Sequence, residues 1–256
     1  MRWFACLFCT FCLSSALEQA VISVPLVDRT VGENPLEARG GGLLRELARA
    51  NELEWSWGER VTVKNLSGNP ILLYVVSITE VGRHVPPAGR HSAPGNGSIY
   101  RLEDDMFFSE KLFGPGESLV LRETMPGTPI VDCCINPLAK LRDPSVEYRL
   151  LFVQFADGST FGDPAEAQDV LSMRQRIVND LLKLRQSYGD RGVSGFTDTL
   201  NERSAFSVTS VYKQILSKFT DEGVLAAVGE AERIIAIAER HAGEITGASS
   251  TRKPSR

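Results

Sequence analysis

The chain has 256 residues, of which 43% are hydrophobic and 23% charged, and its formal net charge is −4. This composition excludes a disordered or collagen-like chain, and the length allows one large domain or two small ones. The mild acidity, and the lack of a basic stripe in the sequence of the predicted folded part, argue against a nucleic-acid-binding protein.

Residues 1–16 read MRWFACLFCTFCLSSA and have the three parts of a secretory signal peptide. Arg2 supplies a positive charge, an apolar run follows, and Ser14 and Ala16 place small residues at the −3 and −1 positions of a cleavage site. The apolar run is too short to span a bilayer comfortably. We therefore predict a secreted, periplasmic or cell-envelope protein. The alternative is a short anchor that is never cleaved, and only then do we expect membrane association.

Residues 17–58 are predicted to form an N-terminal segment and linker. Residues 17–27 have the character of a loose first strand. Residues 28–42 are polar and end in three glycines, which favours a linker. Residues 43–53 carry leucines at helical spacing, so a short helix is expected there.

Residues 59–163 are predicted to form an antiparallel β-sandwich, because apolar stretches alternate with turn signals along this part of the chain. Residues 70–78 are almost continuously apolar, as in a central strand. Residues 146–156 form a second such strand, and Asp157-Gly158 then predicts a tight hairpin turn. Strict alternation in that strand places Tyr148, Leu150, Phe152 and Gln154 on one face and mostly Val146, Leu151, Val153 and Phe155 on the other.

Three sequence features carry a resemblance to known proteins: VTVKNLSGNPI at 61–71, the Gly-Pro-Gly turn at 114–116, and FADGSTFGD at 155–163. Together they resemble a group of uncharacterised secreted bacterial proteins that contain an immunoglobulin-like sandwich. The closing hairpin of that group reads F-x-D-G-x-x-W-G-D, and Phe161 stands here in place of the tryptophan. The resemblance covers residues 59–163 and implies an immunoglobulin-like fold without implying an activity.

Residues 164–246 are predicted to form a module of about three helices, which makes the whole chain an α+β protein. Asp163 is a suitable helix cap and Pro164 suits the first helical position. Apolar residues then recur at helical spacing, with a break at 188–192. The last stretch, 222–245, has a seam spaced alternately by four and three residues. It favours packing within the chain, with homo-oligomerisation as the alternative. Residues 247–256 are predicted to be a disordered tail.

The segment 82–99 is rich in proline and glycine and interrupts the strand pattern. A loop of this length in a compact domain is typical of a functional or disordered segment. Its cationic and imidazole side chains make it the predicted binding loop, suited to an anionic partner. The residues assigned to this binding role are Arg83, His84, Arg90 and His91.

A His/carboxylate metal site is an alternative interpretation of the same loop, because Glu103, Asp104 and Asp105 follow it. Their spacing from the two histidines matches no metal motif, so neither a metal nor a cofactor is predicted.

Only Cys133 and Cys134 remain in the chain once residues 1–16 are removed. Neighbouring cysteines can join only through a strained ring, so they are no disulfide framework. A redox role for this pair is the alternative to two unrelated strand side chains.

The leading hypothesis from the sequence is an exported, non-catalytic protein that binds an unknown protein or envelope partner, or has a structural role in the envelope. No phosphate-binding loop, nucleophile elbow or H-E-x-x-H sequence occurs. The alternatives are a hydrolase or metal-dependent enzyme that uses residues 82–105, and a thiol redox protein that uses Cys133 and Cys134.

Overall fold

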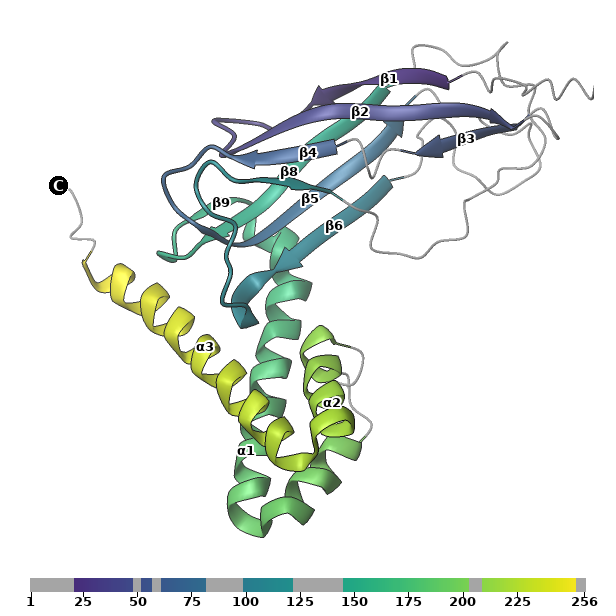
Figure 1. Cartoon of the computed structure of the whole chain (residues 1–256). Helices are drawn as coiled ribbons and strands as arrows, with labels where there is room; N and C mark the ends of the chain where they lie inside the picture. The colour runs from purple at the N-terminus through teal and green to yellow at the C-terminus, as the bar shows by residue number, and fades with distance from the viewer. Residues whose placement is uncertain are drawn as a thin grey trace, which may run out of the picture.

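The computed structural model describes residues 21–47, 52–56, 61–81, 99–121, 145–202 and 209–251. A curled β-sheet forms one end of the molecule and a group of three helices forms the other (Figure 1). The strands are β1 (Val21–Asp28), β2 (Leu36–Leu47), β3 (Glu52–Ser56), β4 (Val61–Asn65), β5 (Ile71–Val81), β6 (Ile99–Asp105), β7 (Ser118–Val120), β8 (Ser145–Phe155) and β9 (Thr160–Gly162). The helices are α1 (Gln168–Asn201), α2 (Ser210–Glu222) and α3 (Val224–Thr251), with short 3-10 helices η1 (Met106–Phe108) and η2 (Pro164–Ala167).

The sheet is a curled, mixed half-barrel, and the prediction of an antiparallel immunoglobulin-like sandwich was wrong. Seven strands follow one another in the order β6-β5-β8-β1-β2-β4-β7, while β3 pairs with β2 and β9 pairs with β8. β1 is antiparallel to β2 through residues 21–25 and parallel to β8 through residues 26–28. Turn signals identify local hairpins, but they carry no information about a parallel pairing between segments about 120 residues apart.

The glycine run 40–42 forms the corner where the sheet curls, so the prediction of a linker there was wrong. β2 pairs with β4 up to Gly40 and with β1 from Gly41 onward. Gly40 has a φ of +108°, and a Cβ on Gly41 would come within 2.0 Å of the Val24 carbonyl oxygen. The glycines are therefore needed for close approach of two strands. The predicted helix at 43–53 was also wrong, because β2 and β3 occupy that stretch.

Strand β5 is an inner strand, between β6 and β8, and both of its faces are buried, as its apolar sequence predicted. Tyr74, Val76 and Ile78 contribute to the core on the concave face. Leu73 and Val75 pack on the opposite face against Ala167 and Val170, at the start of the helical part.

Strand β8 also has two buried faces, but its side chains do not alternate throughout. Val75 pairs with Phe152 and Val76 with Leu150, so Leu151 is an extra residue that forms a β-bulge. Beyond the bulge, each residue lies on the face opposite to the one that strict alternation predicts. The predicted assignment of the β8 side chains to the two faces was therefore wrong. The concave core contains Val146, Tyr148, Leu150, Val153 and Phe155.

The predicted turn at Asp157-Gly158 and the predicted helix cap at Asp163 are confirmed. The Asp157 carboxylate accepts a hydrogen bond from the Ser159 amide at 2.9 Å, and Gly158 has a φ of +79°. The Asp163 carboxylate caps η2 by accepting from the Ala165 amide, with Pro164 at the first helical position. These two aspartates thus shape the turn and the helix start.

The predicted C-terminal module of three helices, and with it the α+β class, is confirmed. α1 has a non-helical residue, Gly192, inside the predicted break. α2 ends at Glu222, and α3 begins at Val224 and extends to Thr251. The seam of α3 packs within the chain, since Ala231 and Ile235 join a core with α1 and α2 residues. Homo-oligomerisation through 222–245 stays an untested alternative.

A candidate ligand-binding cleft

The side chains predicted to bind or to react lie outside the described residues. They are Arg83, His84, Arg90 and His91 of the predicted loop, and the cysteine pair Cys133 and Cys134. The same holds for the signal-like residues 1–16. The acidic residues that follow the loop are described, and they lead to a site that the sequence did not predict.

One buried ion pair attaches α1 to the sheet. The Arg174 guanidinium donates to both carboxylate oxygens of Asp105, through Nε at 2.9 Å and Nη2 at 2.8 Å, and Nη1 donates to Gln154 Oε1 at 2.7 Å. The guanidinium also lies 4.6 Å from the centre of the Phe107 ring. Only 9% of the Arg174 side chain and 16% of the Asp105 side chain are exposed, so the pair is largely shielded from screening by water.

A second contact attaches α3 to η1. His241 is 4% exposed, and its Nδ1 lies 2.9 Å from the carbonyl oxygen of Phe107. Ala238, one turn earlier, packs with Phe107 and with Leu72 of β5. Because η1 directly follows β6, these contacts hold the end of β6 between the helices and the sheet.

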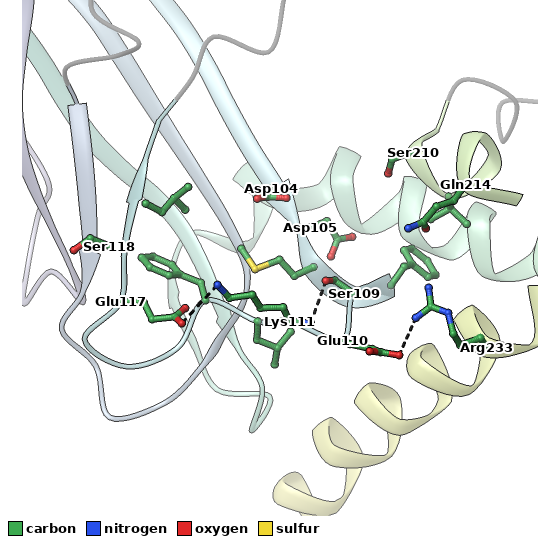
Figure 2. A pocket seen from close by; sticks show the side chains of 16 residues that line it. Asp104, Asp105, Ser109, Glu110, Lys111, Glu117, Ser118, Ser210, Gln214 and Arg233 are labelled. Carbon is green, nitrogen blue, oxygen red and sulfur yellow. Dashed lines mark hydrogen bonds and ion pairs between the residues drawn. The ribbon is translucent and has the colours of Figure 1, made fainter. Parts of the chain in front are cut away.

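An open cleft with a volume of about 850 Å³ lies beside η1, between the segment leading to β7 and helices α2 and α3 (Figure 2). Its apolar part comes mainly from the segment around η1, and its far wall from α2 and α3. The apolar lining residues are Met106, Phe108, Leu112, Phe113, Leu119 and Val211. The polar and charged lining residues are Asp104, Asp105, Ser109, Glu110, Lys111, Glu117, Ser118, Ser210, Gln214 and Arg233.

Most charged side chains of the cleft are used in ion pairs. Lys111 Nζ lies 3.8 Å from Glu117 Oε1 and Arg233 Nη1 lies 2.8 Å from Glu110 Oε1, as the dashed lines of Figure 2 show. Arg233 also pairs with Glu230 at 2.7 Å. The hydrogen bond from Arg233 is the main reason that the pKa of Glu230 is lowered.

Asp104 differs from the other charged residues of this cleft. Within the described parts of the chain, no ion pair or side-chain hydrogen bond is formed by its carboxylate. The side chain is exposed to solvent, yet partial desolvation by the surrounding protein, and then the negative charge of Asp105, raise its pKa. A cation placed beside this carboxylate would stabilise its charged form.

Strand alternation explains why neighbouring aspartates have different roles. Leu102 belongs to the concave core, so Asp104 lies on the same side of β6, while Asp105 faces α1. The sequence alone shows residues 103–105 only as three acidic residues that follow a loop with two histidines. The alternation of β6 would have separated Asp104 from its neighbours, but the cleft wall formed by α2 and α3 carries no local signal.

The lining of the cleft is chemically mixed. It combines an apolar surface, hydrogen-bonding groups and one carboxylate that has no charge partner among the described residues. Among the described residues, His241 is the one histidine, and it does not line the cleft.

No group of three or more His, Cys, Asp or Glu side chains suited to a metal occurs within the described ranges. None of the helices described is long and apolar enough to cross a membrane. Comparisons with models of protein families, with curated proteins and with solved structures gave no match.

Proposed function

We propose that this chain is an exported, non-catalytic binding protein and that the cleft beside η1 is its ligand site. The observation that carries the proposal is Asp104, a carboxylate without an ion-pair partner in the described structure, at the edge of a large open cleft. The other charged lining residues are held in ion pairs. A ligand with a positive group and an adjoining apolar part would satisfy Asp104 and cover the apolar wall.

Site-specific photo-crosslinking tests this proposal in the native host. A photoreactive phenylalanine analogue replaces Gln214, which lines the cleft, and in a matched variant it replaces the adjacent Lys213. Both residues are exposed on α2, and only Gln214 lines the cleft, so the pair separates cleft binding from general contact with the helix. We expect a dominant crosslinked product from position 214 that is weak or missing from position 213. Equal products from both positions, or none from 214, would contradict the proposed site.

Export is proposed from residues 1–16 and has its own test. We expect the mature protein to begin at Leu17, which N-terminal sequencing of the exported form would establish. Replacing Ala16 by arginine should block processing, because the −1 position of a cleavage site requires a small residue. A mature protein that keeps Met1 would identify residues 1–16 as an anchor instead.

A further inference from the structure

The two ends of the curled sheet face a shared hollow. β6 and β7 are the terminal strands in the order β6-β5-β8-β1-β2-β4-β7, so each has one edge without a partner strand among those described. A hollow of about 490 Å³ lies between them. It is lined by Leu102, Glu103 and Asp104 from β6, by Leu119, Val120 and Leu121 at β7, and by Tyr74 of β5.

Strand directions show what a segment in this seam would pair with. The steps from β6 to β7 are antiparallel except for the parallel pair β8–β1, so β6 and β7 run antiparallel to each other. An extended segment between them would be parallel to one and antiparallel to the other. β1 already has this arrangement on the closed side of the sheet, between β2 and β8.

The hollow is continuous with the cleft, because Asp104 and Leu119 line both. The side chains of the seam are mainly apolar, and Val120 is 40% exposed. Of its charged residues, Glu103 has Arg101 at 3.5 Å, while Asp104 has no such partner in the described structure. The seam thus offers strand edges, apolar side-chain sites and one negative charge.

We propose that the seam between β6 and β7 binds an extended basic segment of a partner protein, which adds a strand to the half-barrel and places a lysine or arginine side chain against Asp104. Strand addition to an open sheet edge uses backbone hydrogen bonds for affinity and side-chain sites for selectivity. The charges of β6 would also disfavour indiscriminate pairing of its edge. This inference rests on the proposed function, because it names the ligand class of the same cleft.

Peptide selection tests the ligand class with the full-length protein as bait. A displayed library of random decapeptides is selected on the wild-type chain, and the enriched peptides are measured on Asp104→Asn and Asp190→Asn. Asp190→Asn is the matched control, because it removes one negative charge from an exposed residue of α1 that lines neither the cleft nor the hollow. We expect enriched peptides to contain lysine or arginine, to bind about fivefold more weakly to Asp104→Asn, and to bind Asp190→Asn nearly unchanged.

Backbone methylation and hydrogen exchange test the mode of binding. N-methylation at alternate residues of the selected peptide removes the donors that strand pairing requires. Because successive amides of a strand between β6 and β7 face opposite edges, we expect methylation in either phase to weaken binding. We also expect the unmodified peptide to protect amides in 100–104 and 118–120. Unchanged affinity after methylation, or protection confined to α2 and α3, would overturn strand addition.

The outcomes also separate this inference from the proposed function. If position 214 crosslinks a dominant ligand but no basic peptide is enriched, the cleft is a binding site and the basic-segment inference fails. If neither experiment yields a ligand, both proposals fail. Enrichment of peptides without a cation would likewise overturn the role of Asp104.

Discussion

Tyr148 contributes a polar atom to an otherwise apolar core. Its side chain is fully buried in the concave core, and its hydroxyl has no hydrogen-bond partner among the residues that the structure describes. Burial, with smaller contributions from Asp28 and Tyr74, raises the pKa of Tyr148, which keeps the hydroxyl neutral. An unpaired buried hydroxyl costs free energy that the phenyl ring alone would not.

We therefore expect Tyr148→Phe to raise the free energy of unfolding by about 1 kcal/mol. Tyr212→Phe is the matched control, because the Tyr212 hydroxyl donates to the Leu200 carbonyl at 3.2 Å. That substitution should lower stability by about 1 kcal/mol. Urea titration of both variants measures the change in the free energy of unfolding, which should be positive for Tyr148→Phe and negative for Tyr212→Phe. A loss of stability in Tyr148→Phe would show that its hydroxyl has a partner.

Asp104 makes a second prediction at the residue scale. Because desolvation and Asp105 raise its pKa in the folded protein, the folded state holds the proton more tightly than the unfolded state. Stability from this group is therefore greatest in acid and declines as the pH rises between the ordinary aspartate pKa and the raised value. Asp104→Asn should increase stability at neutral pH and remove this dependence, whereas Glu103→Gln should not. Thermal melts from pH 3 to pH 7 would measure the difference, and a destabilised Asp104→Asn at pH 7 would contradict it.

At the scale of elements, the structure depends on a bulge and the glycine beside it. The Leu151 carbonyl accepts from the Asp163 amide at 3.2 Å, and Gly162 lies against it with a φ of +86°. A Cβ on Gly162 would come within 2.1 Å of the Leu151 oxygen. Both the backbone angle and the space at this position therefore require glycine.

Gly162→Ala should lower the free energy of unfolding by roughly 2–4 kcal/mol, because it combines an unfavourable φ with a clash against backbone. Gly189→Ala is the control, since Gly189 lies within α1 and nothing is within 4 Å of its added Cβ. That change should raise stability by about 0.5–1 kcal/mol through helix propensity. Chemical denaturation measures the free energy of unfolding of the two alanine variants. A Gly162→Ala variant as stable as Gly189→Ala would contradict the prediction.

The attachment of α1 to the sheet also belongs to this scale. Arg174→Met should cost about 3 kcal/mol, because it leaves the Asp105 carboxylate, 16% exposed, without its cation. Arg191→Met removes an ion pair with Asp198 whose side chains are 54% and 63% exposed, so its cost should stay below about 1 kcal/mol. Equal stability losses in the two variants would show that burial of the Arg174 pair is energetically unimportant.

At the scale of the whole molecule, the sheet and the helices share hydrophobic contacts. Leu73, Val75 and Phe152 pack with Ala167 and Val170. Ala238 of α3 packs with Leu72 and Phe107. Such contacts couple the two parts, so the chain should unfold in a single transition.

Substitution of two alanines on α3 tests this coupling. Ala238→Asp places an unpaired charge at a position that is 6% exposed, and should lower the melting temperature by about 5–10 °C or separate the transition into two. Ala236→Asp changes an exposed position of the same helix and should leave one transition. Calorimetry measures both, and an unchanged melt for Ala238→Asp would show that the α3 contact with the sheet does not contribute to stability.

Much of the local structure was predictable, because its causes lie within a few residues. The turn at Asp157 and the cap at Asp163 depend on side chains bonding amides two positions away. Asn65 shows the limit of such reasoning. It begins a glycosylation-like Asn-Leu-Ser sequence, yet it is fully buried and its amide donates to the Asn69 and Phe113 carbonyls. The sequence pattern alone could not reveal that burial.

The sequence by itself determined the α+β class, the inner strands β5 and β8 with two buried faces, the last hairpin and the three C-terminal helices, because periodicity and turn chemistry act locally. Only the tertiary structure decided that β1 joins β8 in parallel, that the glycines at 40–42 form a corner, and that Leu151 is a bulge. It also placed Asp104 of β6 opposite α2 and α3, at the edge of the cleft. These features depend on contacts between segments far apart in the chain, and composition and spacing do not encode which distant segment each one meets.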